Sequence, residues 1–199
     1  MLLEFGETVH KGRASLTKAF PKVLERLQER IPVYLISLLD AQYQRLADLD
    51  AHIDDIEKQL SAVAKQNETC RQLLEIPGVG PLIATAAVAT MGEASAFKSG
   101  REFAAFVGLV PKQTGTGGRV KLLGISKRGD TYLRTLFIHG ARAAALLAKN
   151  PGVWIVELKT RRPTAVAIVA MANKLARTVW AIAAHNSKYD RNHVSVRPY

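Results

Sequence analysis

Cysteine is almost absent from this sequence, since Cys70 is the only one in 199 residues. A single cysteine excludes an internal disulfide and a cysteine-based zinc site, and it agrees with a reducing cytosol. We expect Cys70 to be a packing residue of a helix. No signal-peptide pattern is visible either, because Gly6, Glu7 and the bases Lys11 and Arg13 follow the first apolar residues. The expected location is the bacterial cytoplasm, in association with the nucleoid.

Apolar runs long enough to cross a membrane are also lacking. The run 81–91 is too short, and the run 163–184 is interrupted by Asn173, Lys174 and Arg177. We therefore expect no membrane partner.

Acidic residues are too few to balance the bases. The chain has 28 Lys and Arg against 17 Asp and Glu, which gives a net charge of +11 and a pI near 10.0. Between residues 95 and 142 there are only two acids, Glu102 and Asp130, and the bases there are Lys98, Arg101, Lys112, Arg119, Lys121, Lys127, Arg128, Arg134 and Arg142. This segment alone contributes 9 − 2 = +7, so a polyanion is the expected partner.

Helical spacing of apolar residues dominates the chain, and 48% apolar composition is enough for a core. The pattern predicts an all-α fold with a long coiled-coil helix followed by a compact helical domain. No strand pattern is convincing. We expect four regions: 1–12, a remnant of a preceding domain; 13–67, a helical dimerisation region; 68–186, the DNA-binding domain; and 187–199, a flexible basic tail.

A long helix is predicted from Val33 to about Gln66, after a first helix that Pro21 should kink or divide. Its apolar residues recur in steps of seven, three and four: Leu39, Leu46, Leu49, Ile53, Ile56, Leu60 and Val63. This heptad seam, with a net charge of −4 over residues 40–68, favours self-association over DNA contact. The alternative is a long helix packed on its own domain.

A turn between two helices is predicted at 76–81, the sequence Ile-Pro-Gly-Val-Gly-Pro. Gly78 and Gly80 flank Val79, and Pro81 suits the first position of a helix. The backbone amides of these three residues would lie at a positive helix end, which is a ready phosphate site. A tight turn between packed helices explains the turn equally well.

Residues 111–124 are the least helical part of the chain and predict a mobile, basic, glycine-rich loop in the form of a loose hairpin. Its hydroxyl groups and those just after it belong to Thr114, Thr116 and Ser126. The surrounding cations are Lys112, Arg119, Lys121, Lys127 and Arg128. A hydroxyl among cations can attack a DNA phosphodiester. The alternative is structural, with the threonines as polar loop residues and Ser126, or Asp130, as the cap of the next helix.

Metal and nucleotide sites find no support in the sequence. The five histidines are far apart without a carboxylate cluster, and His139, inside an apolar helical pattern, is expected to be a core histidine. The glycines at 115, 117 and 118 do not form a phosphate-binding P-loop.

Seven segments in order resemble the C-terminal half of insertion-sequence transposases of the DEDD type. These segments are residues 76–81, 97–101, 108–111, 123–130, 132–134, 139–142 and 172–177. Such enzymes are RNA-guided recombinases in which a RuvC-like domain is joined through a coiled coil to a transposase domain.

The resemblance implies that the turn at Gly78, Val79 and Gly80 belongs to a helix-hairpin-helix-like unit that grips nucleic acid. It also implies that the loop holds the nucleophile, for which Thr116 is the best-matched hydroxyl because this chain has Gly115 and Thr116 where the family carries serines. The contacts to DNA would be completed by Lys112, Arg119, Lys121, Ser126, Lys127, Arg128 and Arg134.

The sequence contains no RuvC-like domain, so we expect a fragment without its own metal cofactor; a divalent metal belongs to that other domain. The expected function is the DNA-binding and dimerisation portion of a transposase that acts by strand cleavage and rejoining. Its expected partners are DNA, a guide RNA, and further copies of the chain in a dimer or higher oligomer. The alternative is a non-catalytic DNA-binding scaffold, or an inhibitor that pairs with the full-length transposase.

Overall fold

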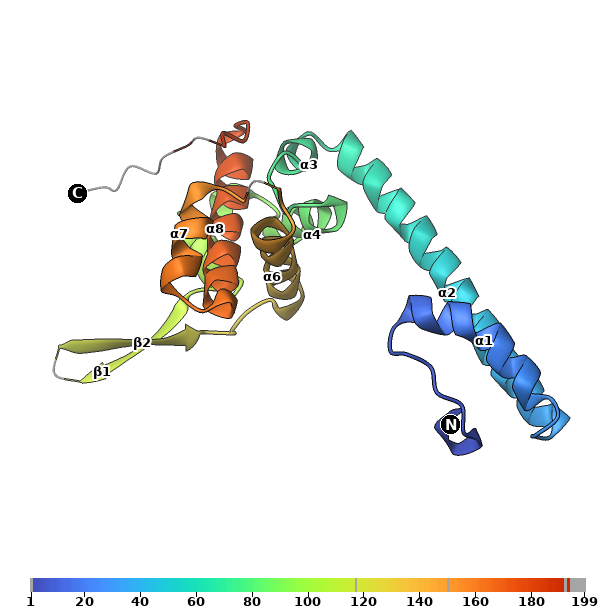
Figure 1. Cartoon of the computed structure of the whole chain (residues 1–199). Helices are drawn as coiled ribbons and strands as arrows, with labels where there is room; N and C mark the ends of the chain where they lie inside the picture. The colour runs from blue at the N-terminus through green and yellow to red at the C-terminus, as the bar shows by residue number, and fades with distance from the viewer. Residues whose placement is uncertain (1, 117, 150, 192, 194–199) are drawn as a thin grey trace. The chain divides into compact units, whose positions relative to one another are not determined.

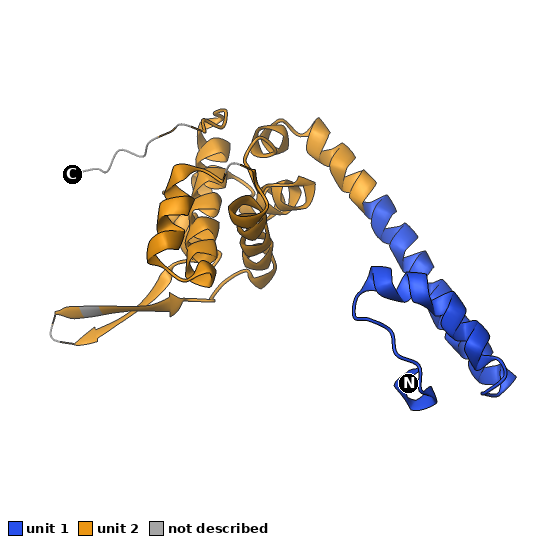
Figure 2. Ribbon diagram, viewed as in Figure 1, with its two compact units in different colours: residues 1–56 blue, residues 57–199 orange. Residues whose placement is uncertain are grey.

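The computed structural model describes residues 2–116, 118–149, 151–191 and 193, and the chain is mostly helical, as predicted (Figure 1). It divides into two compact units, 1–56 and 57–199 (Figure 2). The four regions expected from the sequence stay a prediction. Residues 192 and 194–199 of the expected tail lie outside the described residues.

The first unit contains a short 3-10 helix η1 (Leu2–Phe5), helix α1 (Arg13–Leu27) and most of α2 (Val33–Gln66). Its core consists of Phe20, Val23 and Leu27 of α1 with Leu39 of α2. Leu39, the first residue of the expected heptad seam, therefore packs against its own chain. The predicted bounds of the long helix are confirmed, since Pro32 precedes it and Asn67 caps the helix that follows.

Pro21 lies inside one helix, α1, which it does not divide in two. Proline has no amide hydrogen, so the Thr17 carbonyl one turn earlier loses its helical donor. The Tyr43 hydroxyl of α2 donates a hydrogen bond to that carbonyl at 3.1 Å. The Tyr43 ring also stacks on Phe20, with 4.5 Å between ring centroids. The proline thus leaves an acceptor that a neighbouring helix uses.

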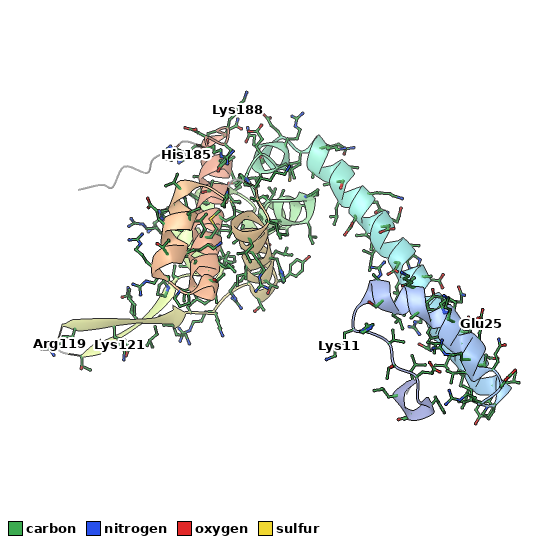
Figure 3. The ribbon with its side chains drawn as sticks, viewed as in Figure 1. Lys11, Glu25, Arg119, Lys121, His185 and Lys188 are labelled. Carbon is green, nitrogen blue, oxygen red and sulfur yellow. The ribbon has the colours of Figure 1, made fainter. Side chains whose placement is uncertain are left out.

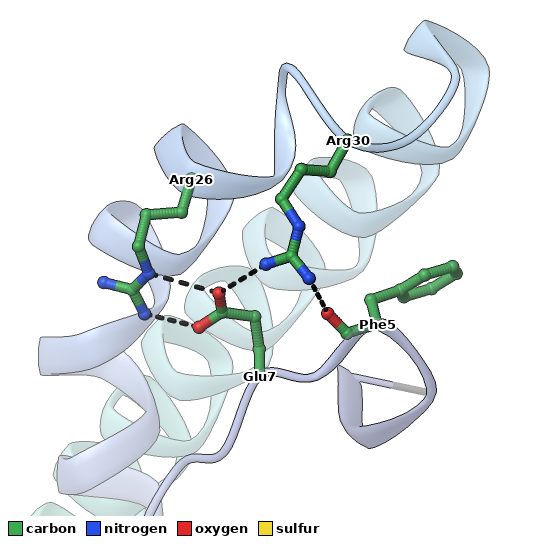
Figure 4. A network of polar contacts seen from close by, with 4 residues as sticks. All are labelled: Phe5, Glu7, Arg26 and Arg30. Atoms are coloured by element: carbon green, nitrogen blue, oxygen red, sulfur yellow. Dashed lines mark hydrogen bonds and ion pairs between the residues drawn. The ribbon is translucent and has the colours of Figure 1, made fainter.

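Glu7 holds the N-terminal segment against α1 (Figure 4). Its carboxylate accepts hydrogen bonds from both Arg26 and Arg30, at 3.2 Å from Arg26 Nε and 3.3 Å from Arg30 Nη1. Arg30 Nη2 also donates to the Phe5 carbonyl at 2.8 Å. Leu2, Phe5 and Val9 pack beside the α1 core, so the ion pair and the apolar contacts fix the same segment.

Acidification is expected to release this segment. The hydrogen bond from Arg26, together with the charges of Arg26 and Arg30, lowers the pKa of Glu7 below its ordinary 4.5. A group with a lowered pKa stabilises the fold above the unfolded-state pKa and loses this effect as pH falls through the folded-state pKa. Amide protection of Gly6 and Glu7 should therefore be full near neutral pH and fall in strong acid.

The control is Glu29→Gln, which removes an exposed carboxylate outside this network. It should leave the acid transition in place, whereas Glu7→Gln should weaken the protection at every pH. An unchanged acid transition in Glu7→Gln would contradict the role given to this ion pair.

The second unit is built around α8 (Thr164–His185). Helices α3 (Glu68–Leu73), α5 (Gly100–Phe106), α6 (Thr131–Leu146) and α7 (Val153–Arg161) contact α8, and α4 (Pro81–Met91) packs on α3 and α6. A short 3-10 helix, η2 (Ala94–Ala96), lies between α4 and α5 and also touches α8. The core includes Leu175 and Val179 of α8 with Phe103 and Phe137. Cys70 is buried in the same core, as predicted, and burial raises the pKa of its thiol.

Polar side chains on α8 bind the loops that surround it. Asn173 Nδ2 donates to the Leu109 carbonyl at 3.2 Å, and Trp180 Nε1 donates to the Ala94 carbonyl at 3.0 Å. Lys174 Nζ lies 4.6 Å from the ring centroid of Trp154 in α7. The polar residues that interrupt the apolar pattern of this helix therefore hold neighbouring segments in place.

By length and composition α8 is apolar enough to cross a membrane. The expectation that Asn173, Lys174 and Arg177 exclude such a span on composition is therefore too strong. In this structure the residues of α8 that are buried belong to the protein core, as in the central helix of a globular domain.

Two features differ from the sequence expectation. The basic loop is a two-stranded antiparallel hairpin of β1 (Pro111–Thr116) and β2 (Arg119–Ile125), although no strand pattern is visible in the sequence. A half-buried strand alternates apolar and polar residues, and this hairpin does not, because described residues on both of its faces are exposed. The apolar pattern from Phe97 to Leu109 predicts one short helix that starts at Phe97. In the structure α5 begins only at Gly100, because Ser99 caps it and Glu102 accepts a hydrogen bond from the Lys98 amide at 2.7 Å.

Candidate nucleic-acid interface

The hairpin extends away from the helices of its unit (Figure 1). Thr114 pairs with Lys121 and Thr116 with Arg119. Paired residues share a face, and so do residues two apart on one strand. The register therefore brings four polar side chains to one face of the hairpin, which we call the cationic face: Thr114, Thr116, Arg119 and Lys121. Figure 3 shows Arg119 and Lys121 toward the turn end of the hairpin.

Leu122 lies on the opposite face of the hairpin, where it pairs with Gln113. One extra residue stands on β2 between this pair and the next, Pro111 with Ile125, so a bulge occurs at 123–124 opposite Lys112. Leu122 and Leu123 are 61% and 47% exposed, and neither belongs to a hydrophobic cluster of the described residues. The hairpin therefore presents a cationic face, with Leu122 uncovered on the opposite face and Leu123 uncovered at the bulge.

The root of the hairpin is held by backbone contacts between 106–110 and 126–129. The Ser126 amide donates to the Val110 carbonyl at 2.8 Å, and the Lys127 amide donates to the Gly108 carbonyl at 3.2 Å. Gly108 and Gly129 both have positive φ, and each lies too close to the other segment's backbone to carry a side chain. The two ends of the hairpin are thus fixed on the domain.

Arg134 lies beneath this root and is only 8% exposed. Its guanidinium donates to the Val107 carbonyl at 3.0 Å, to the Arg128 carbonyl at 3.2 Å and to the Thr131 hydroxyl at 3.0 Å. The Nη1 and Nη2 groups of Arg134 are therefore already engaged by oxygens of the protein. Arg134 therefore positions the root, and we do not propose it as a phosphate contact.

The cations expected to surround one hydroxyl form two groups. Arg119 and Lys121 lie with Thr116 on the hairpin, while Lys127 and Arg128 are at the root with Ser126. Thr116 is therefore beside Arg119 and at the opposite end of the hairpin from Arg128. All four cations are exposed.

Asp130, rather than Ser126, caps α6, because its carboxylate accepts from the Leu133 amide at 2.9 Å. Ser126 Oγ accepts only a long 3.5 Å bond from the Arg128 amide.

The turn between α3 and α4 packs closely on α6. Gly78 has φ +90°, and a Cβ there would collide with the Gly140 carbonyl and come within 3.0 Å of the Ala144 Cβ. The Val79 side chain is buried, and its amide donates to the Ile76 carbonyl at 2.9 Å. Gly80 is different, because nothing lies within 4 Å of its Cβ position. Packing thus explains why residue 78 is a glycine. Within this turn, open space for a ligand lies beside Gly80.

The described residues contain no group of three His, Cys, Asp or Glu that could hold a metal ion. His139 is exposed on α6, so the expectation of a core histidine is wrong. The inward positions of this turn of α6 are taken by Phe137 and Gly140.

Two residues acquire a candidate role only from the structure. Leu122 and Leu123 are exposed on the hairpin, and adjacent leucines in an otherwise polar basic loop were the available signal.

The long helix α2 carries a stripe of apolar residues that are each about half exposed, from 45% to 55%. The stripe consists of Leu46, Leu49, Ile53, Ile56 and Val63. These residues continue the heptad seam beyond Leu39. An uncovered stripe of this length marks a candidate surface for a partner helix.

Comparison with known proteins finds a match to a family model over most of this interface. Residues 70–153, which include the α3–α4 turn, the hairpin and α6, match the model of the Transposase IS116/IS110/IS902 family. The chain is 40% identical over 194 residues to a "Probable family 20 transposase" of Pseudomonas aeruginosa, a match that covers 95% of the chain and 57% of that protein.

Two further relatives carry insertion-sequence names. Identity is 39% over 193 residues with the transposase for insertion sequence element IS1111A of Coxiella burnetii, covering 95% of the chain and 53% of the relative. It is 36% over 194 residues with the transposase for insertion sequence element IS1328 of Yersinia enterocolitica, covering 96% and 57%. The chain thus spans little more than half the length of these relatives, and its similarity is to transposases of insertion sequences.

Proposed function

We propose that this chain, similar over nearly its whole length to insertion-sequence transposases, is the DNA-binding and self-associating portion of such an enzyme. The chain would be the C-terminal half of a DEDD-type, RNA-guided transposase. The whole enzyme would act in DNA transposition by strand cleavage and rejoining. Its partners are DNA, a guide RNA, and a second copy that pairs along the α2 stripe.

The observation that supports DNA binding most strongly is the hairpin with its root. Residues 111–128 contain five bases and no acid. Exposed cations on a projecting ribbon suit a phosphate backbone, which attracts protein mainly by charge. Lys112, Arg119, Lys121, Lys127 and Arg128 are the proposed phosphate contacts, and the Gly80 amide at the start of α4 is a further one.

Thr116 is the proposed nucleophile. Its Oγ1 would form a bond to the phosphorus of a phosphodiester while the bond to one sugar oxygen breaks, and the hydroxyl proton would pass through solvent to that oxygen. Arg119, its partner in the hairpin register, is placed to offset the charge that develops on the phosphate oxygens. This step is written with groups of the chain itself, and a divalent metal is proposed only for the RuvC-like domain.

The second candidate function is a non-catalytic DNA-binding scaffold, or an inhibitor that pairs with a full-length transposase through α2. It is favoured by Thr116 itself, because the methyl group of a secondary alcohol crowds in-line attack on phosphorus. Both candidates require DNA binding, and they differ in whether Thr116 becomes linked to DNA.

DNA binding should weaken steeply as salt concentration rises, because each phosphate contact releases counterions. Arg119→Ala and Lys121→Ala should each lower the log-log salt slope by about one and weaken binding to all sequences alike. Fluorescence anisotropy with a labelled duplex at several salt concentrations measures both quantities. Lys188→Ala, an exposed cation after α8, is the matched control. Unchanged affinity and slope in both hairpin variants would show that the interface lies elsewhere.

Covalent linkage to DNA should depend on Thr116. The chain, mixed with a RuvC-like partner and DNA, should form an adduct that survives a denaturing gel and disappears in Thr116→Ala. Thr116→Ser should form it faster, because the crowding methyl is gone. Thr114→Ala, two residues away on the same face, is the control. The absence of a Thr116-dependent adduct in every mixture would favour the scaffold.

A further inference from the structure

We propose that the hairpin is a strand-separating wedge, with Leu122 and Leu123 lying against unstacked bases and the cationic face following the phosphates of the displaced strand. This inference rests on the proposed function, because it assigns a task to the hairpin within DNA binding. It concerns two residues that phosphate binding alone leaves without a role.

The exposure of the two leucines is the first step. Leu122 and Leu123 are 61% and 47% exposed, and no cluster of described residues covers them. A two-stranded hairpin without a covered apolar face is only marginally stable in water. Here the root supplies the anchor through the Ser126 and Lys127 amides and Arg134, so the leucines are free to contact a partner.

The charge around the leucines identifies that partner as nucleic acid. Lys112, Arg119 and Lys121 lie on the hairpin, and no acid occurs in residues 111–128. An apolar surface for another protein would not require this excess of positive charge. Apolar side chains flanked by cations are instead the combination with which proteins unstack base steps.

The two faces of the hairpin separate the two tasks. Thr114, Thr116, Arg119 and Lys121 share one face, and Leu122 is on the other. A ribbon lying in an intact groove would turn one of these faces away from the DNA. A ribbon between two separated strands uses both, since its cations follow one backbone while Leu122, with Leu123 beside it at the bulge, covers the bases at the junction.

Forked DNA separates this wedge from simple phosphate binding. The full chain should bind a fork about tenfold more tightly than a paired duplex of the same sequence, because the fork needs no unstacking. With the paired duplex, 2-aminopurine at the binding site should brighten as its neighbours unstack. The variant Leu122→Gln/Leu123→Gln should lose the fork preference and the brightening while its salt slope is unchanged.

The remaining outcomes distinguish the wedge from simple DNA binding and from contact between copies of the chain. Binding by the wild-type chain without brightening or fork preference overturns the wedge and leaves the proposed DNA-binding function intact, whereas no binding to either DNA overturns both. A double variant that keeps the fork preference but changes its mass in light scattering assigns the leucines to contact between copies and overturns the wedge. Leu122→Gln alone repeats the test, and circular dichroism checks that each variant is folded.

Discussion

Gly129→Ala and Gly108→Ala are each expected to lower the free energy of unfolding of the 57–199 unit by about 3 kcal/mol or more. Both glycines have positive φ, +83° and +79°. A Cβ at residue 129 would overlap the Phe106 carbonyl, and one at residue 108 would overlap the Arg128 carbonyl. The atoms in the way are backbone atoms of the root, and the Arg128 carbonyl also accepts a hydrogen bond from Arg134, so neither clash is relieved by turning a side chain. Urea unfolding followed by circular dichroism measures the loss.

Gly118→Ala is the matched control, because Gly118 also has a positive φ, +78°, but nothing lies within 4 Å of its Cβ position. Its cost should be limited to the backbone conformation, about 1–2 kcal/mol. If Gly129→Ala were no more costly than Gly118→Ala, the close approach of the two segments at the root would be contradicted. A folded Gly129→Ala protein with weakened DNA binding would still connect the root to the orientation of the hairpin.

Gly78→Ala is expected to cost about 2–3 kcal/mol, whereas Gly80→Ala should cost less than about 1 kcal/mol. Gly78 combines φ +90° with a backbone contact to Gly140. Gly80 has φ −97° and open space at its Cβ position. Thermal and urea unfolding of the two variants compare residues that are only two positions apart in the same turn. Equal costs would show that packing on α6 does not determine the residue at 78.

The same pair of variants also decides between the two interpretations of the turn. If the turn binds phosphate through the Gly80 amide, Gly80→Ala should retain stability and weaken DNA binding, because its methyl group would occupy the open space. If the turn is only a packing element, Gly80→Ala should change neither quantity. Anisotropy with the duplex used for the hairpin variants gives the answer.

Most helix bounds could be predicted because their signals are local. Pro32 and Asn67 border the long helix, Pro81 begins α4, and the Asp130 carboxylate caps α6. Each of these residues acts on amides within a few positions of itself. Ser99 and Glu102 act over the same short range, and they place the start of α5 at Gly100 rather than at the apolar Phe97.

The sequence predicted a loose hairpin at 111–124 but not its two strands. Its strands show no apolar alternation, since every described side chain of β1 is exposed and Leu122 is exposed on β2. The backbone hydrogen bonds that pair the two strands do not depend on side-chain polarity, so the order of apolar and polar residues does not reveal them. The division of Thr116 and Ser126 between the two ends of the hairpin was therefore outside the reach of sequence reasoning.

Residue type and local spacing thus determined the helices, the excess of positive charge between residues 95 and 142, and the heptad seam, because these properties depend on neighbours within two or three turns. Tertiary contacts decided which of the charged and polar residues meet solvent. Arg134 looked like one more cation of the basic segment, yet three oxygens from the hairpin root and α6 bring it inside. His139 looked internal, yet Gly140 beside it makes the contact with the α3–α4 turn. Both outcomes depend on segments that are distant in the chain, where a position on a helix does not specify which side will be covered.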